Sequence, residues 1–188
     1  MILFLDFDGV LHHKDAAGRE LRPRDQTTLD SLSDAERRYI DKEGRLIVGA
    51  NLFCHAERLV IALQPFPDVR IVISSSWRKY FDIDSLKVFL PATLADRVIG
   101  VTPVVFPCDG TCLRSREIYR YFSEHNLHTN WLALDDTSYH FFDYDKNPNL
   151  ILLNGECGFD NAAADILCAR LNDVFTESQK LTTTPPPS

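Results

Sequence analysis

The sequence predicts a three-layer α/β domain with a mostly parallel sheet of five strands. Apolar runs of strand length alternate along the 188 residues with amphipathic segments of helix length, the order found when helices cover both faces of a parallel sheet. The runs are apolar at consecutive positions, as expected for strands buried on both faces. Three runs end in a polar residue at the edge where such sheets bind ligands, namely Asp6, Ser74 and Asp135.

The composition is that of an ordinary globular domain, with 45% hydrophobic and 25% charged residues. No apolar run is long enough to cross a bilayer and no signal peptide precedes the first strand, so we expect a cytoplasmic protein without membrane contact. Five scattered cysteines argue against a disulfide framework. The net charge of −7 argues against a broad basic face for nucleic acid, but not against local binding of a strand end.

The first predicted strand, residues 2–6, is followed by a change of character. Residues 13–50 are charged, turn-rich and only weakly periodic, which predicts a small insert in the domain. Within this insert, Ser33 and Glu36 have the spacing of a capping box, and a helix is predicted over 33–43.

The alternation resumes after the insert and continues to the final helix. The further predicted strands are 70–73, 97–101, 131–134 and 150–153, and the predicted helices are 52–63, 84–90, 114–125 and 160 to about 174. We therefore expect one domain over residues 1–175. Residues 176–188 end in threonines and prolines with little apolar content, so we expect a disordered tail there.

The polar strand ends predict a metal site. Because parallel strands end at the same edge, Asp6, Ser74 and Asp135 should meet, and Asp8 and Asp136 add two more carboxylates. Like charges near 4 Å repel by about 4 kcal/mol per pair close to a protein surface, so the cluster needs a cation. Carboxylate ligands favour Mg²⁺.

The residues that follow the second buried strand leave alternatives open. Ser74 directly follows the strand, whereas Ser75 and Ser76 either share its role or cap a short helix. Trp77 and Arg78 would place an aromatic ring and a cation at the pocket rim, suited to a nucleotide base or a second phosphate. The alternative is that Trp77 belongs to the core.

These motifs resemble those of the haloacid dehalogenase (HAD) superfamily of phosphotransferases. Asp6–Val10 is similar to its first motif, Ser74 to its second and the Asp135–Asp136 pair to its fourth. The resemblance runs from residue 2 to about 173 and implies a Rossmann-like HAD fold. The 13–50 insert lies where these proteins carry a cap and is too short for a full cap domain, which implies a small flap over an open site.

The chain resembles most closely the small HAD domains of Swiss Army Knife RNA repair proteins. It is also similar, through its paired aspartates and an Arg-x-x-Glu-Ile helix, to the phosphatase half of polynucleotide kinase-phosphatases. The segments that carry the closer resemblance are Ser74–Arg78, Gly100–Pro103, Arg114 with Glu117 and Ile118, and Leu132–Asp136.

The resemblance implies covalent catalysis. Asp6 would attack phosphorus to give an aspartyl-phosphate, and Asp8 would act as the acid and then the base. Ser74, Ser75 and Arg114 would bind the phosphate, with Arg116 as the alternative cation.

The resemblance also implies how the metal is held. Asp6, Asp135 and the backbone carbonyl of Asp8 would bind Mg²⁺, with Asp136 as a further ligand or orienting group.

Two histidines after the first motif, His12 and His13, would either line the entrance or lie solvated in a loop.

We therefore expect a Mg²⁺-dependent phosphohydrolase, a HAD-type phosphatase that acts on a phosphomonoester. The expected partner is a phosphorylated small molecule or a nucleic-acid end, such as a 3′-phosphate met in nucleic-acid repair, and no obligate protein partner is evident. Two alternatives are a non-catalytic phosphate- or partner-binding module and a small-metabolite phosphatase or phosphotransferase.

Overall fold

The computed structural model describes residues 1–19, 25–106 and 112–182. Its main sheet has five strands in the order β5-β4-β1-β6-β7, and every neighbouring pair is parallel. The strands are β1 Ile2–Leu5, β4 Arg70–Ile73, β5 Val98–Val101, β6 Trp131–Asp135 and β7 Leu150–Leu152. The predicted α/β class and the parallel five-stranded sheet are confirmed.

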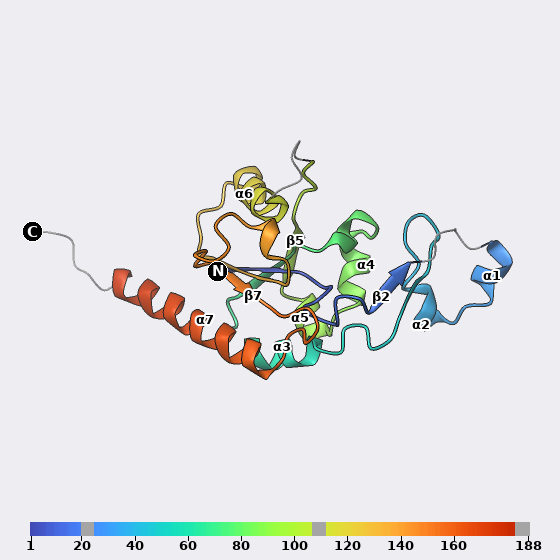
Figure 1. Ribbon diagram of the computed structural model, residues 1–188, viewed down its shortest axis with the longest axis horizontal. Coiled ribbons are helices and arrows are strands. Elements are labelled where there is room, and N and C mark those ends of the chain that lie inside the picture. Colours follow the sequence, from blue (N-terminus) through green and yellow to red (C-terminus); the bar gives the residue numbers. More distant parts are fainter. Residues whose placement is uncertain (20–24, 107–111, 183–188) are drawn as a thin grey trace, which may run out of the picture.

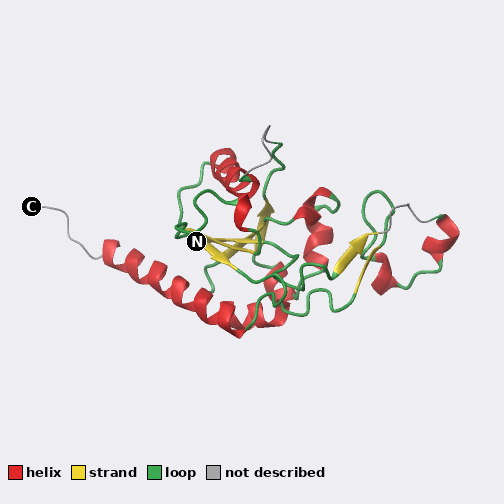
Figure 2. Ribbon diagram, in the orientation of Figure 1, coloured by secondary structure: helices red, strands yellow, loops and turns green. Residues whose placement is uncertain are grey.

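Helices cover both faces of this sheet (Figures 1 and 2). They are α3 Ala56–Leu63, α4 Ile83–Val88, α5 Ala92–Ala95, α6 Leu113–His125 and α7 Asn161–Thr182, with short 3₁₀ turns η1 Ser76–Lys79 and η2 Ser138–His140. Side chains alternate along β1, so Leu3 and Leu5 pack in the core beneath α3 and α7, whereas Ile2 and Phe4 pack beneath α6. Because this alternation forms a core on each face of the sheet, the predicted three-layer arrangement is confirmed.

The register of the central strands aligns their carboxyl ends. Leu5 of β1 pairs with Ile73 of β4 and with Leu134 of β6. The amide of Asp6 donates to the carbonyl of Leu134 (3.1 Å), and the amide of Ser74 donates to the carbonyl of Leu5 (2.8 Å). The polar residues that follow these strands therefore lie side by side at one edge.

The 13–50 insert extends away from the body (Figure 1). It contains β2 Ala17–Arg19, α1 Gln26–Asp30, α2 Asp34–Arg37 and β3 Ile47–Gly49. Strand β2 pairs with β3 in an antiparallel ladder, and we call residues 13–50 the flap.

The helix predicted over 33–43 is wrong in length, although its Ser33 capping box is formed. The helix ends early because the buried Asp41 starts a turn, in which its carboxylate accepts the amide hydrogens of Glu43 and Arg45 at 2.9 Å each. This turn sends the chain back, so that Ile40 bridges to Leu46. A buried aspartate that accepts local amide hydrogens is a turn signal that competes with the helix.

Two helix ends also differ from the prediction. Helix α3 begins at Ala56 rather than 52, because Asn51 and Phe53 have positive φ angles of 57° and 60°. Helix α7 continues to Thr182 rather than ending near Val174, so the tail expected from residue 176 begins in a helix. Phe175 stacks on Phe66 with ring centroids 5.9 Å apart, which supports the helix beyond the predicted end.

The rest of the expected tail, residues 183–188, lies outside the described residues. Among the helices that the structure does describe, none is both long enough and apolar enough to span a membrane.

Candidate active site

Arg114 of α6 joins two carboxylates at the carboxyl edge of the sheet. Its Nη2 donates to Oδ2 of Asp6 at 2.9 Å, and its Nε donates to Oδ2 of Asp135 at 3.1 Å. Asp6 is 5% exposed and Asp135 is 1% exposed. Burial lowers the pKa of Arg114, but the charges of Asp6, Asp135 and Glu117 raise it by more. The guanidinium is thus a fixed cation between the two aspartates.

A third carboxylate completes an acidic cluster with these two. Oxygens of Asp6, Asp135 and Asp136 all lie within 4.8 Å of one another. Burial and the charge of Asp6 raise the pKa of Asp135 to about 8, against the opposing effect of Arg114. The amide of Thr137 donates to Asp135 at 2.8 Å, and its hydroxyl donates to Asp136 at 2.9 Å, which orients both side chains.

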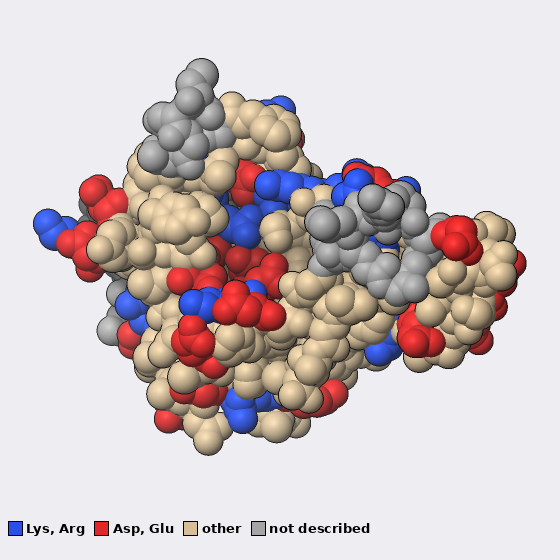
Figure 3. All heavy atoms as spheres, turned by 45° about the vertical axis from the view of Figure 1, so that its right-hand side comes forward, with Lys and Arg blue, Asp and Glu red and all other residues tan. Residues whose placement is uncertain are grey.

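The chemistry of this cluster fits a hard divalent cation. Its donors are all oxygens, the ligand type that Mg²⁺ prefers. The carboxylates of this cluster and of its ion pairs, namely Asp6, Glu117, Asp135 and Asp136, also outnumber the two guanidinium groups that pair with them, those of Arg78 and Arg114. Figure 3 shows acidic and basic side chains gathered in a hollow near the middle of one face.

Two glycines make room for Asp136. A Cβ at Gly9 would lie 2.1 Å from Oδ2 of Asp136, and one at Gly155 would lie 2.3 Å from the same oxygen. Gly9 also has a φ of +68°, a conformation that other residues adopt rarely. The first motif and the loop after β7 therefore approach this carboxylate as bare backbone.

The side chain of Asp8 turns away from the acidic cluster toward neutral donors. Trp77 Nε1 lies 3.1 Å from Oδ1 and 3.2 Å from Oδ2 of Asp8. His12 Nε2 lies 3.0 Å from Oδ1, and the Ser76 hydroxyl lies 3.3 Å from Oδ2. The Asp8 side chain remains 31% exposed, so it is the more accessible of the first-motif carboxylates.

His12 is fully buried, and its surroundings fix its tautomer. The amide of Phe53 donates to His12 Nδ1 at 3.3 Å, so Nδ1 accepts and the ring proton lies on Nε2. His12 therefore donates to Asp8. The expectation of a solvated His12 is wrong, because its ring lies in contact distance of Phe53 and Trp77 within the core.

The serines after β4 have different surroundings. Ser74 is buried beside Asp6, and its Oγ is 3.5 Å from the donating hydroxyl of Thr102. Ser75 is fully buried, and its Oγ accepts the amide hydrogen of Trp77 at 3.5 Å as the N-cap of η1. The structure thus places Ser74 at the edge with the aspartates and gives Ser75 the capping contact.

Trp77 and Arg78 are both buried, so the alternative that Trp77 belongs to the core is the one found, although its indole also lines the recess beside Asp8. The prediction that Arg78 lies at the pocket rim is wrong. Trp77 is 3% exposed, and the Arg78 side chain is 1% exposed. Arg78 Nη2 pairs with Glu117 Oε1 at 2.5 Å, its Nε donates to the Thr102 carbonyl at 2.9 Å, and its Nη1 donates to the Ser75 carbonyl. Buried carbonyl groups at two strand ends need donors, and Arg78 supplies them.

Burial and the nearby charge of Arg114 lower the pKa of Arg78 to about 10, against the effect of Glu117. Glu117 accepts from Arg114 as well, at 3.4 Å. Glu117 thus links the two guanidinium groups, a role not predicted from the sequence. The Arg-x-x-Glu spacing, which puts both side chains on one face of a helix, was the available signal.

The structure separates the two candidate arginines of α6. Arg114 reaches Asp6 and Asp135, whereas the guanidinium carbon of Arg116 lies 5.9 Å from the ring centroid of Phe142. The side chains of Arg114 and Arg116 face different ways because the two residues are two positions apart on the helix.

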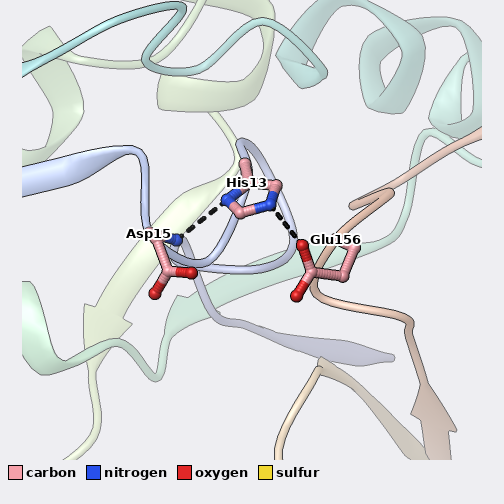
Figure 4. A group of neighbouring side chains, drawn as sticks. All are labelled: His13, Asp15 and Glu156. Atoms are coloured by element: carbon pink, nitrogen blue, oxygen red, sulfur yellow. Dashed lines mark hydrogen bonds and ion pairs between the residues drawn. The ribbon is translucent and has the colours of Figure 1, made fainter.

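A second group of possible metal ligands lies outside this cluster (Figure 4). His13 Nδ1 accepts the amide hydrogen of Asp15 at 3.1 Å, and its Nε2 lies 2.6 Å from Glu156. Lys14 Nζ lies 2.7 Å from the other oxygen of Glu156. Both nitrogens of His13 are engaged, so this group acts as an ion-pair network between the flap and the loop after β7.

A recess of about 120 Å³ opens beside Asp8, between the body and the flap. The body contributes aromatic and polar side chains, and the flap contributes the charged Lys14 with the apolar Ala17 and Ile47. Its lining residues are Asp8, Lys14, Ala17, Ile47, Ser76, Trp77 and Tyr80.

Comparisons with known proteins bear on this site. The family model described as the HAD domain in Swiss Army Knife RNA repair proteins matches residues 2–164. No curated protein matches. Among solved structures, a variant of the fission yeast RNA polymerase II CTD phosphatase Fcp1, bound to beryllium fluoride, is 12% identical with a TM-score of 0.34. That match covers 94% of this chain and 51% of the other, so the chain spans about half the length of that protein.

Proposed function

Because this chain belongs to the family of HAD domains found in Swiss Army Knife RNA repair proteins, we propose that it is a Mg²⁺-dependent phosphatase acting through an aspartyl-phosphate. The observation that carries the proposal is the pairing of Arg114 with Asp6 and Asp135, with the accessible carboxylate of Asp8 two residues from Asp6. This arrangement combines a nucleophile, a fixed cation and a separate acid in one site.

The first step transfers the phosphoryl group to the protein. An Asp6 oxygen forms a bond to phosphorus while the bond from phosphorus to the leaving oxygen breaks. Protonated Asp8 gives its proton to that oxygen, so the leaving group departs as a neutral alcohol. Arg114 and the Ser74 hydroxyl donate hydrogen bonds to the non-bridging oxygens.

The second step regenerates the carboxylates. A water molecule attacks phosphorus, the Asp8 carboxylate takes the proton that the water loses, and the bond from Asp6 to phosphorus breaks. Phosphate leaves, Asp6 returns as a carboxylate, and Asp8 is again protonated for the next cycle.

The acidic cluster is the proposed magnesium site. Asp6, Asp135, the Asp8 backbone carbonyl and Asp136 would hold the ion. When bound, Mg²⁺ neutralises negative charge on the aspartates and on the phosphate, so that an anionic nucleophile can approach an anionic substrate.

The proposed substrate is a phosphomonoester, either a nucleotide or a 3′-phosphate at a nucleic-acid end. The description of the family, which names RNA repair, supports the nucleic-acid end. The short flap supports it too, because a site without a full cap domain leaves space for a polymer. A small-metabolite phosphatase or phosphotransferase and a non-catalytic phosphate-binding module are the competing functions.

Replacing the nucleophile tests the proposal. Asp6→Asn keeps the shape of the side chain but removes the attacking charge, so turnover of an aryl phosphate should fall by about 10³-fold or more. Asp68→Asn is the matched control, because Asp68 is exposed just before β4, at the opposite edge of the sheet from Asp6. Circular dichroism checks that both variants are folded. Unchanged turnover in Asp6→Asn would rule out the mechanism.

A substrate panel then separates the candidates. It compares 3′-phosphorylated oligonucleotides, nucleotides and sugar phosphates, with Mg²⁺ and after its chelation by EDTA. We expect reversible loss with EDTA and the highest kcat/KM on the oligonucleotides. Phosphate binding without turnover on any substrate favours the non-catalytic module, and product formation that needs an added alcohol favours the phosphotransferase.

A further inference from the structure

The Asp8 carboxylate is held on two sides by neutral donors. The indole N–H of Trp77 lies at nearly equal distances from both oxygens, 3.1 and 3.2 Å, and therefore fixes the direction in which the carboxylate points. His12 donates to Oδ1 alone, at 3.0 Å, and fixes the rotation of the carboxylate plane. A carboxyl group with two such donors has few orientations left.

Neither donor is free to move. Trp77 is surrounded by rings at centroid distances of 5.3–5.9 Å, those of Phe7, His12, Phe53, Phe81 and Phe89. His12 is anchored at its other nitrogen by the amide of Phe53. A core packed in this way holds side chains in single rotamers, so the two donors present Asp8 in one orientation.

The exposed part of Asp8 faces the recess beneath the flap. Asp8 is one of the groups that line this recess, together with the indole of Trp77 and the flap residues Ala17 and Ile47. The sides of the carboxylate that accept hydrogen bonds from Trp77 and His12 cannot carry its proton as well. The proton of the acid is therefore left on the side that is open to the recess. The Ser76 hydroxyl, 3.3 Å from Oδ2, also lines this recess, and because a hydroxyl can accept as well as donate it is compatible with a proton there.

We infer that Trp77 and His12 are positioning residues that aim the proton of Asp8 at the leaving oxygen, whose organic group enters the recess. The inference rests on the proposed function, since it concerns the acid of the same reaction. A general acid must come within about 2.6–3.2 Å of the oxygen that it protonates. Without the two donors, Asp8 rotates and meets that geometry less often.

A leaving-group series tests this inference. Good leaving groups need little help from an acid, whereas poor ones need the proton as the bond breaks. The experiment measures the first-step rate of Trp77→Phe, in single-turnover reactions, on aryl and alkyl phosphates with alcohols of increasing pKa. We expect p-nitrophenyl phosphate to react within about 3-fold of the wild-type rate and alkyl phosphates to react about 10- to 100-fold more slowly.

Three further variants sharpen the test. Trp131→Phe is the matched control, because Trp131 lies in the opposite core against Phe4, and it should leave the dependence on leaving group unchanged. His12→Leu removes the second donor and should steepen the dependence. His12→Gln places an amide N–H near the position of Nε2. It should bring the dependence on leaving group part of the way back to that of the wild-type protein.

Each outcome decides the inference. Equal losses on good and poor leaving groups in both Trp77→Phe and His12→Leu indicate a structural role and overturn it, as does an unchanged series. His12→Leu gives an independent answer if Trp77→Phe does not fold. No turnover by the wild-type protein on any phosphate overturns the proposed function itself, whereas turnover with an unaltered series overturns this inference alone.

Discussion

At the residue scale, the burial of Asp135 would couple Mg²⁺ binding at the proposed site to pH. Burial and the charge of Asp6 raise the pKa of Asp135 to about 8, so in the metal-free protein this carboxyl holds a proton at neutral pH. A cation that binds the carboxylate has to displace that proton. Metal affinity and proton affinity therefore oppose each other at one residue.

We predict that the affinity for Mg²⁺ rises between pH 6 and 8 and levels off above about pH 8. The increase should approach tenfold per pH unit below the pKa of Asp135, because one proton leaves for each ion bound. Isothermal titration calorimetry in two buffers of different ionisation enthalpy measures both the affinity and the released proton. An affinity that does not change over this range would contradict the prediction.

The same raised pKa sets the sign of the effect on stability. The unfolded carboxyl has a pKa near 3.9, so between about pH 4 and 8 the folded protein holds a proton that the unfolded chain has lost. The contribution of Asp135 to the free energy of unfolding is therefore fully present at low pH and is lost as the pH rises toward 8. Asp135→Asn removes this dependence and serves as the control for the metal-free protein.

At the residue scale, the sequence predicts strand ends better than turns. Asp6 and Asp135 were placed together correctly because the register of neighbouring parallel strands leaves little choice. The direction of Trp77 depends on a 3₁₀ turn after β4, and the contact of His12 depends on a turn after Asp8, neither of which has a periodic pattern. The contacts of Trp77 and His12 with Asp8 therefore could not be predicted from the sequence.

At the scale of elements, the flap decides the size of the recess. Ala17 of β2 pairs with Gly49 of β3 and lines the recess, which at about 120 Å³ is close to the roughly 150 Å³ that holds one benzene ring. A larger side chain at position 17 fills this space without touching Asp6 or its partners.

We predict that Ala17→Phe lowers kcat/KM by about tenfold or more for phosphomonoesters with a ring next to the leaving oxygen, and much less for methyl phosphate. Val48→Phe is the matched control, because Val48 lies in the same two-stranded ladder, is 45% exposed and does not line the recess. Steady-state kinetics on both substrates measure the difference. Equal effects of the two variants would show that the recess does not receive the leaving group.

The elements themselves were predicted unevenly. The apolar strands of the sheet were found to within about one residue, because buried parallel strands combine apolar runs with flanking turn residues. The elements of the flap were not found this closely. Its strands β2 and β3 are three residues long, and its helix α2 ends before the turn made by Asp41. Short elements held by single hydrogen bonds leave little periodic signal.

At the scale of the whole molecule, net charge limits how a nucleic acid binds. The chain carries a net charge of −7, and the two arginines of the site, Arg78 and Arg114, are buried among carboxylates. Lys14, which lines the recess, pairs with Glu156. A nucleic-acid end would therefore be held by its terminal phosphate rather than by many backbone phosphates along the strand.

We predict a shallow dependence of kcat/KM on salt for 3′-phosphorylated oligonucleotides. The slope of log kcat/KM against log salt concentration should be about −1 to −2, because each neutralised phosphate of a single strand contributes about −0.7. Kinetics at 50–300 mM KCl on oligonucleotides of two to twenty nucleotides measure this slope, which should not grow with length. A slope steeper than about −4 that increases with length would contradict end binding.

The sheet order β5-β4-β1-β6-β7 could not be read from periodicity, which locates strands but not their neighbours. The prediction therefore named a mostly parallel five-stranded sheet without an order of strands. Likewise, Phe175, which lies just beyond the predicted end of α7, stacks on Phe66, a contact between segments more than one hundred residues apart. Long-range packing of this kind has no local sequence signature.

The fit of Gly9 and Gly155 around Asp136 also constrains how this sequence can vary. These positions lie in three distant stretches of the chain, yet a side chain at either glycine occupies the space of the same carboxylate oxygen. A side chain at position 155 meets mainly the end of the Asp136 side chain, so a smaller residue at 136 makes room for it. A side chain at position 9 would still lie 2.7 Å from Cβ of residue 136 and would be strained by the positive φ. In a mutational library, positions 136 and 155 should therefore vary together, whereas position 9 should stay glycine.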